Sequence, residues 1–388
     1  VLLQGAVLAA DFEAGMNYFK AGKYVEAAAE FQAIVEESPD YDYGYFILGH
    51  SFLKMKKQND AIENFRKAID LNGDKFEYHL GLAQAYLVAG NYARTEQALT
   101  AAEGLVGNNT LAFYSMRGAA NYQLKKWSSA IDDLEKANAA EKNPAKKANN
   151  LVMIGKGYDG LRNYDKAAKA YESSNKLKPS DQTAMLLAVA QQNAGGQATS
   201  DAEKKRWYSA SLATAEQLAA KKPGDFDVVN TLGRSALGAE QFQKAVAAFD
   251  KVLAIKPDYC PAMINRAKAY HFLENWKGAE ATLAKASNGA CDGKLKAQAI
   301  EMQGYTYRKM DRLQDSLRTY EEALKLNPSS AAIKTAISEV KHNIETNEFN
   351  ASAAAQEAEA RAAAEAAQRE YEEQQKKVKE WEKKREDQ

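Results

Sequence analysis

One short pattern recurs along the chain, and the stretch Tyr45-Phe46-Ile47-Leu48-Gly49-His50-Ser51-Phe52 shows it clearly. The stretch Val229-Asn230-Thr231-Leu232-Gly233-Arg234 is similar, and in both cases an Ala follows the Gly after 12 positions and a Phe after 16. In this register a small residue returns along the chain, at Gly15, Gly49, Ala83, Gly118, Gly155, Ala188, Gly233, Ala267 and Gly304. The steps between them are 34, 34, 35, 37, 33, 45, 34 and 37 residues, so the sequence contains nine units of one kind.

The prolines give the same frame independently. Pro39, Pro179, Pro257 and Pro328 each lie 24 positions after the small residue of a unit, and Pro223 precedes Pro257 by 34. Because proline cannot continue a helix, these positions mark the places where one unit ends and the next begins.

Within each unit the apolar residues recur at helical spacing, without the alternation of a strand. Aromatic rings lie three residues after the small position, at Tyr18, Phe52, Tyr86, Tyr158, Tyr270 and Tyr307. Others lie nine residues after it, at Tyr24, Tyr92, Trp127, Tyr164, Phe242 and Trp276. A small residue lets two helices approach closely, and one helix pair cannot bury its apolar face alone. The sequence therefore predicts stacked helix hairpins.

This pattern of small, aromatic, Ala, large apolar and Pro positions resembles the tetratricopeptide repeat over roughly residues 8 to 330. The resemblance implies an all-α fold, a right-handed superhelical α-solenoid of antiparallel helix hairpins. Two units depart from the pattern. Asn121 stands where an aromatic residue is usual, and about eleven extra residues around 194–200 point to a longer inter-helix loop or an extended helix start. A tolerated insertion is favoured there over a functional lid.

Three segments follow from this frame: residues 1–10, a repeat array over 11–346, and a charged helix over 347–388. Ile333, Ile337, Val340 and Ile344 recur at helical spacing and predict a capping helix at the end of the array. The last segment is rich in Ala, Glu, Lys and Arg and has a partial heptad seam at Tyr371, Val378 and Trp381. A solvated single helix and a coiled coil with a partner helix both remain open.

The apolar residues 1–10 end in small residues, at Val7-Leu8-Ala9 and Leu8-Ala9-Ala10, as a signal-peptidase site does. We expect a signal-peptide remnant and an exported protein, periplasmic or attached to the cell envelope. An apolar helix start would instead leave the protein cytoplasmic. The two cysteines, Cys260 and Cys291, lie at the same end of one predicted hairpin, so an exported chain could form a disulfide there. Two buried thiols are the alternative.

Composition and motifs exclude several functions. The 52 Lys and Arg balance 52 Asp and Glu, so the chain lacks the basic surplus of a nucleic-acid-binding protein. It has no apolar stretch of the roughly 20 residues that a membrane span needs. Four scattered histidines, no HExxH, no CxxC, no phosphate-binding loop and no GxSxG elbow predict no metal, no cofactor and no catalytic residue.

In proteins of the resembled family, the first helix of each unit lines a concave groove that binds partners. The corresponding apolar positions in the first half of this chain are Phe12, Met16, Phe19, Tyr43, Phe46, His50, Leu53, Leu80, Leu87, Met116 and Tyr122. The more polar positions in the second half are Lys156, Asn230, Arg234, Asn265, Lys268, His271, Tyr305, Arg308 and Lys309. Rings and methionines suit an apolar peptide or amphipathic helix, and the basic residues suit carboxylates. Alternatively, the rings pack against neighbouring units, and the basic row is a solvated face.

The sequence thus predicts a non-catalytic protein-binding scaffold or adaptor of the cell envelope, with a protein or peptide ligand. The family's carboxylate clamp, a set of Lys, Asn and Arg residues, is not found in the first three units. A self-associating structural subunit and a cytoplasmic co-chaperone-like adaptor are the alternative functions.

Overall fold

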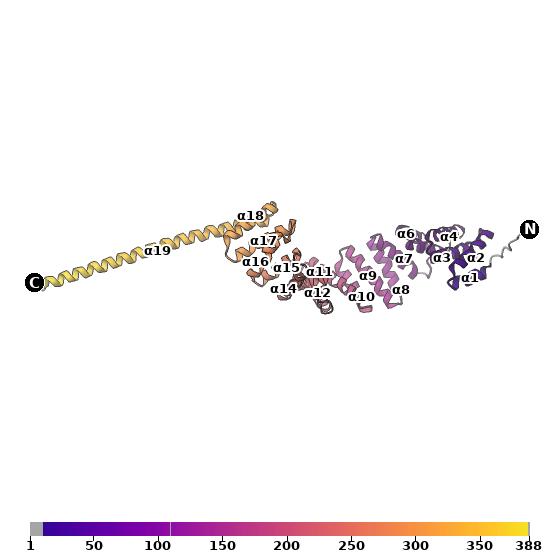
Figure 1. Ribbon diagram of the computed structural model, residues 1–388, viewed down its shortest axis with the longest axis horizontal. Helices are drawn as coiled ribbons and strands as arrows, with labels where there is room; N and C mark the ends of the chain where they lie inside the picture. The colour runs from indigo at the N-terminus through magenta and orange to yellow at the C-terminus, as the bar shows by residue number, and fades with distance from the viewer. Residues whose placement is uncertain (1–10, 109, 387–388) are drawn as a thin grey trace, which may run out of the picture. The chain divides into compact units, whose positions relative to one another are not determined.

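The computed structural model describes residues 11–108 and 110–386, and these residues form helices and no strand. Residues 1–10, where a signal remnant is expected, lie outside the described part. The chain divides into two compact units, Val1–Pro223 and Gly224–Gln388 (Figure 1). We describe each unit by itself.

The first unit consists of six helix hairpins in sequence order. Its helices are α1 (Phe12–Lys20), α2 (Tyr24–Glu37), α3 (Asp42–Lys54), α4 (Gln58–Leu71), α5 (Phe76–Val88), α6 (Tyr92–Ala101), α7 (Thr110–Gln123), α8 (Trp127–Ala140), α9 (Pro144–Gly160), α10 (Tyr164–Leu177), α11 (Asp181–Gln197) and α12 (Asp201–Lys221). A short 3-10 turn, η1 (Glu103–Leu105), follows α6. Within the unit, helices that follow one another in the chain pack against each other.

The second unit has three hairpins and a terminal helix. Its helices are α13 (Phe226–Gly238), α14 (Phe242–Ile255), α15 (Cys260–Phe272), α16 (Trp276–Lys285), α17 (Gly293–Lys309), α18 (Leu313–Leu326) and α19 (Ala331–Glu386), with a π-helical turn η2 (Ala286–Ala290) after α16. The nine hairpins of the two units are the nine predicted repeats. Pro39, Pro179, Pro223, Pro257 and Pro328 all lie between hairpins, as predicted.

The small position of each repeat is buried. In eight hairpins a large apolar or aromatic residue lies 16 positions later and packs near it, whereas in the sixth hairpin, which has the insertion, that position is Lys204. In the fifth hairpin, a Cβ added to Gly155 would lie 2.5 Å from Cε1 of the Tyr171 ring. Tyr171 itself is completely buried. Glycine is required at this position because any side chain would separate the two helices of the hairpin.

The turn inside eight of the hairpins contains one residue in the left-handed backbone region, always seven positions after the small residue. Two of these are glycines, Gly22 and Gly90, with φ of 75° and 73°. Six are not glycine: Lys56, Lys125, Arg162, Glu240, Glu274 and Asp311, with φ between 54° and 61°. The turn geometry of the repeat is therefore kept even where a side chain makes it costly.

The hairpin with the insertion corrects one prediction. Its connection is short, residues 198–200, because the extra residues lengthen both helices, α11 to 17 residues and α12 to 21. Gly195 and Gly196 both lie inside α11. The Tyr208 ring packs on Gly195, where an added Cβ would lie 2.9 Å from the ring. The longer inter-helix loop is thus wrong, and helix extension is correct.

Asn121, the exception to the aromatic pattern, belongs to a buried polar group. Arg117 donates two hydrogen bonds to the Asp133 carboxylate, from Nε at 2.9 Å and from Nη2 at 2.8 Å. The Asn121 amide donates a third at 3.2 Å. An aromatic ring at position 121 would leave this buried carboxylate with one partner fewer.

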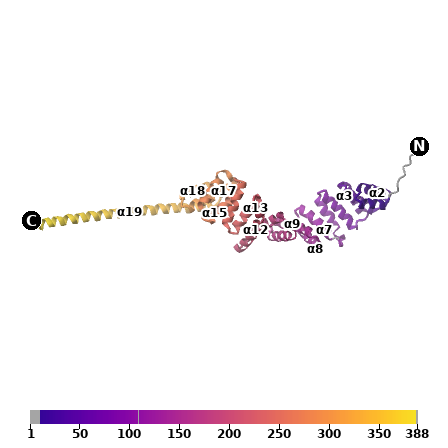
Figure 2. The same cartoon turned by 60° about the horizontal axis from the view of Figure 1, so that its bottom comes forward.

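The capping segment and the charged segment form one continuous helix, α19. Its first part packs on α18 through Ile333 and Val340, both fully buried, and through Ile337 and Ile344. The described side chains from Glu345 onward are exposed. In both views α19 extends beyond α18 without a break (Figures 1 and 2). No helix in the described ranges has the length and apolar character needed to cross a bilayer.

Candidate protein-binding surfaces

The residues predicted to line the groove all lie on the first helices of the hairpins. In the first unit they belong to α1, α3, α5, α7 and α9, and in the second to α13, α15 and α17. The two units therefore carry two separate sets of candidate residues.

In α1 and α3 the aromatic candidates pack mainly on one another. The Phe46 ring lies 4.6 Å from the His50 ring and 4.8 Å from Tyr78, measured between ring centroids. Phe12 makes an edge contact with Phe31 at 5.8 Å, and Leu53 is buried. These contacts cover part of each ring, but Phe12 is still 39% exposed and Phe46 is half-buried, so part of this predicted lining stays accessible.

His50 is held as a neutral side chain inside this ring cluster. Besides Phe46, the Phe65 ring packs against its imidazole, with 4.9 Å between the ring centroids. Burial, with a smaller contribution from Lys54, lowers the pKa of His50 to about 4. His50 is thus a packing residue near neutral pH.

Further along the first unit, α5, α7 and α9 enclose a groove of about 670 Å³. Leu87 of α5 and Met116 of α7, both predicted, lie in its wall. The remaining lining residues are Asn108, Leu111, Ala112, Ser115, Ala119, Glu141, Lys146, Asn149 and Asn150. The floor is apolar and comes from α5 and α7, whereas the polar side comes from α9 and the turn before it.

The sequence reasoning missed most of this groove. Ala112, Ser115 and Ala119 lie within four residues of Met116 on α7, so their position on that helix alone could have added them to the predicted set. Asn149 and Asn150 of α9 gave no such signal, because the repeat frame does not say which polar residues of the next hairpin turn toward α7.

In the second unit the predicted basic row does not act as one group. Arg234 is exposed on α13 and Lys268 is partly buried on α15. Arg308 of α17 instead forms an ion pair with Glu339 of α19, and both Arg308 and Lys309 lie over the Tyr305 ring. Arg308 therefore fixes the capping helix, and we remove it from the candidate ligand-binding residues.

His271 is also engaged within the second unit. Its Nε2 lies 2.9 Å from the Thr306 hydroxyl oxygen, and its ring packs against Trp276 and Tyr305. Burial lowers the pKa of His271 to about 4. With His271 and Arg308 engaged, Arg234, Lys268, the exposed Lys309 and the amides Asn230 and Asn265 remain as the polar candidates of this unit.

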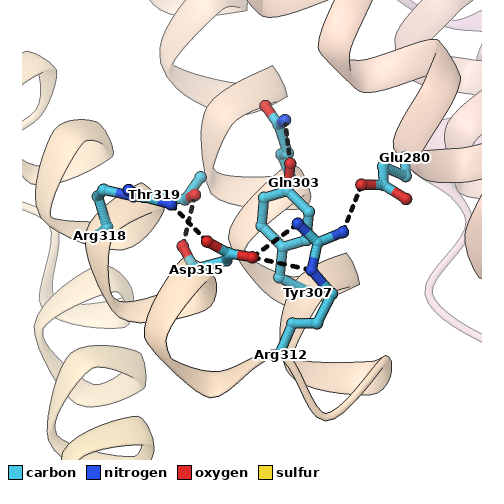
Figure 3. Close-up of polar contacts among 7 residues, drawn as sticks. All are labelled: Glu280, Gln303, Tyr307, Arg312, Asp315, Arg318 and Thr319. Carbon is cyan, nitrogen blue, oxygen red and sulfur yellow. Dashed lines mark hydrogen bonds and ion pairs between the residues drawn. The ribbon is translucent and has the colours of Figure 1, made fainter.

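A polar cavity of about 410 Å³, which the sequence did not indicate, is lined by residues of η2, α17 and α18. The Asp315 carboxylate accepts from Arg312 Nε at 2.8 Å and pairs with Arg318 (Figure 3). Arg312 also reaches Glu280 of α16 at 2.6 Å and lies over the Tyr307 ring of α17. Arg312 holds the pKa of Asp315 below its usual range. These charges compensate one another and join three helices, so their role is structural.

Cys260 and Cys291 are joined by a disulfide, with their Cα atoms 5.2 Å apart. Both are buried in a cluster with Met263, Ile264 and Leu283. The bond connects the first residue of α15 to the residue after η2. Among the described residues, no group of three or more His, Cys, Asp or Glu side chains is arranged to hold a metal ion.

Nine antiparallel helix hairpins with small residues at their crossing points, and a groove on their first helices, define an α-helical repeat protein of the binding-scaffold class. The tetratricopeptide repeat models match residues 9–41, 46–104, 148–181, 198–259, 236–290 and 297–330. The chain belongs to the tetratricopeptide repeat family. Proteins of this family bind protein partners.

Several solved structures are similar to this chain. The C-terminal part of a TPR repeat-containing protein from Cytophaga hutchinsonii is 18% identical, with a TM-score of 0.47, over 66% of this chain and 99% of that one. MamA from Desulfovibrio magneticus is 16% identical, with a TM-score of 0.41, over 50% and 99%. A thermophilic TPR protein from Thermus thermophilus is 19% identical, with a TM-score of 0.35, over 50% and 98%.

Proposed function

We propose that this protein is a non-catalytic scaffold of the cell envelope that holds a peptide or helix of a partner protein in the groove between α5, α7 and α9. The observation that carries the proposal is the groove itself, which combines an apolar floor with a polar side on the first helices of three successive hairpins. These helices are also the ones that the family resemblance points to.

The chemistry of the lining indicates the kind of segment that fits. Leu87, Leu111 and Met116 offer apolar side chains, and methionine adapts its shape to different partners. Asn149 and Asn150 supply amide groups that donate to and accept from a peptide backbone. The ligand is therefore an amphipathic segment whose apolar side chains enter the groove and whose polar face meets α9.

A second surface, on α13 and α15, suits a different feature of a partner. Arg234 and Lys268 have no ion pair among the described residues, and Arg234 is exposed. An acidic segment of a partner would gain charge-assisted hydrogen bonds here. We treat this as a separate contact of the second unit.

Two features support an exported location. Residues 1–10 have the composition of a signal-peptide end, and the cysteine pair is bonded. Disulfides persist in oxidising compartments such as the periplasm. Detection of the protein in the periplasmic or envelope fraction of its source cells would support this part of the proposal, and detection in the cytosol alone would contradict it.

The groove is tested with a defined ligand. A peptide selected from a random helical library against the full chain would be labelled, and its affinity measured by fluorescence anisotropy. Leu87→Ala and Met116→Ala should each weaken binding by about 1 kcal/mol or more, because each removes buried apolar contact.

Val88→Ala is the matched control. Val88 follows Leu87 directly in α5, but its side chain is 55% exposed and it does not line the groove. Its substitution should leave affinity unchanged. Equal affinity of all three variants would show that the selected peptide binds elsewhere and would contradict the groove as the binding site.

A further inference from the structure

The terminal part of α19 is a long helix that its own unit leaves uncovered. Its packing against α18 ends at Ile344, and α19 continues to Glu386. Four large side chains of the uncovered part are exposed: Phe349 at 74%, and Tyr371, Val378 and Trp381 at between 49% and 59%. An isolated helix gains nothing from these residues, whereas a helix that packs against another helix buries them.

Tyr371, Val378 and Trp381 fit one heptad stripe, with a spacing of three and four residues, on a helix whose first part carries alanine on several faces. Taking Tyr371 and Val378 as a positions, the a and d positions from residue 360 onward are Ala360, Ala364, Ala367, Tyr371, Gln374, Val378, Trp381 and Arg385. The stripe is asymmetric along the helix. Its first part contains only alanine, and its second part contains the large side chains.

Charge is asymmetric along the same stretch. Residues 357–373 contain six glutamates and two arginines, whereas residues 376–386 contain six lysines and arginines and three glutamates. One half of the helix is therefore acidic and the other basic. Two copies that run in opposite directions place acidic residues beside basic ones, and copies that run in the same direction place like charges together.

We propose that two copies of this chain associate through residues 357–386 of α19 as an antiparallel coiled coil. In the register set by the stripe, Val378 of one copy faces Ala367 of the second, and Trp381 faces Ala364. Large side chains thus meet small ones in these layers, and Tyr371 meets Gln374 near the two-fold axis. The interface is self-complementary and closes as a dimer.

The residues that flank this seam agree with the register. Glu370 of one copy lies beside Lys377 of the second, and the two-fold symmetry creates this attraction twice. Gln368 lies beside Gln375, a neutral pair. Within one helix the Lys377 ammonium also forms an ion pair with Glu373 at 2.9 Å.

A parallel, in-register pair is disfavoured by the same residues. It places Trp381 against Trp381 and Arg385 against Arg385 at the seam, and it leaves the alanine part with no large side chains to contact. It also brings the two acidic halves together. The sequence of α19 thus distinguishes the two orientations.

The oligomeric state is measured on the full chain by light scattering coupled to size-exclusion chromatography, at several concentrations. We expect a mass of twice the 42.7 kDa chain at high concentration. Val378→Ala together with Trp381→Ala should raise the dimer dissociation constant by about tenfold or more, because each side chain is buried twice in the pair. Circular dichroism confirms that the variant keeps its helix content. A monomer at all concentrations, or a dimer that is unaffected by the two substitutions, would overturn the proposal.

The orientation is tested by cysteine cross-linking under mild oxidation. Ala367→Cys and Val378→Cys chains, mixed in equal amounts, should form a linked dimer, and each variant alone should not. Lys379→Cys, on the outer face next to Val378, is the matched control and should not link to Ala367→Cys. Linking of Val378→Cys to itself would show a parallel pair and would overturn the antiparallel arrangement.

Discussion

At the scale of single residues, the buried charges of the fourth hairpin show how a departure from the repeat pattern is accommodated. The Arg117 and Asp133 side chains are 12% and 4% exposed, and Asn121 adds a hydrogen bond to the Asp133 carboxylate. Breaking a buried ion pair by removing one partner is costly, because the remaining charge is left without compensation.

We therefore expect Asp133→Ala to lower the free energy of unfolding by about 3 kcal/mol. Chemical denaturation monitored by circular dichroism measures the loss. Asp132→Ala is the control, since Asp132 is the preceding residue of α8 but is exposed. Its effect should stay within about 0.5 kcal/mol. Similar losses in the two variants would show that the buried pair is not the cause.

His50 makes a pH-dependent contribution whose sign follows from its environment. Its pKa is about 4 in the folded chain, below the ordinary value of 6.5. The unfolded chain therefore binds the proton first as pH falls. The contribution of His50 to the free energy of unfolding is therefore complete above about pH 6.5. It decreases as the pH falls, until the folded form also takes up the proton near pH 4.

We compare the unfolding free energies of the wild type and of His50→Gln, which does not titrate. The advantage of the wild type should shrink by about 2 kcal/mol between about pH 7.5 and pH 5. His271 titrates in both proteins, so its contribution cancels. A constant difference over this range would mean that His50 is solvated and not buried between Phe46 and Phe65.

At the scale of helices and turns, the left-handed position of the hairpin turn is occupied by six residues other than glycine. Such a residue costs roughly 1 kcal/mol, because its Cβ approaches the following carbonyl oxygen. Lys125, with φ of 57°, is exposed and forms no ion pair among the described residues. Within this part of the chain, its side chain therefore makes no ion pair that offsets the cost of this backbone conformation.

Lys125→Gly should thus raise the free energy of unfolding by about 0.5 to 1 kcal/mol, measured by thermal or chemical denaturation. Lys125→Ala separates the backbone effect from the loss of the charge, since it removes the ammonium group and keeps the strained Cβ. Stabilisation of both variants to the same extent would refute the backbone explanation.

The disulfide connects the two ends of the eighth hairpin, with a sequence separation of 31 residues. Because a cross-link restricts the unfolded chain, Cys260→Ala together with Cys291→Ala should lower stability by about 3 kcal/mol. Reduction of the wild type should produce a loss of the same size. Non-reducing mass spectrometry that finds two free thiols in the purified protein would contradict the bond.

The limits of the sequence reasoning also lie at this scale. The nine hairpins and their boundaries could be predicted, because a small residue, a ring and a proline recur at fixed separations. The structure of the insertion could not, since the packing of Tyr208 on Gly195 is a contact between two helices that no local pattern encodes. For the groove, Leu87 and Met116 were predicted, whereas the enclosure of Phe46 by Tyr78 and Phe65 depends on how neighbouring hairpins meet.

At the scale of the whole molecule, each hairpin packs on its neighbours in the chain, so the stability of each unit depends on interfaces between successive hairpins. The last interface of the second unit is between α18 and the first part of α19. There Ile333 and Val340 of α19 share a buried cluster with Ile300 and Tyr320. The exposed remainder of α19 makes no such contact among the described residues.

Two truncations separate the two parts of α19. A chain that ends at residue 346 keeps every apolar contact of the capping segment, so its melting temperature should equal that of the full chain at protein concentrations where the full chain is monomeric. A chain that ends at residue 330 exposes Ile300 and Tyr320, and its second unit should melt at a lower temperature or aggregate. Differential scanning calorimetry measures both. If removal of residues 347–388 lowered the melting temperature at protein concentrations where the full chain is monomeric, this part of α19 would have to contact its own repeats, and the surface proposed for pairing would not be free.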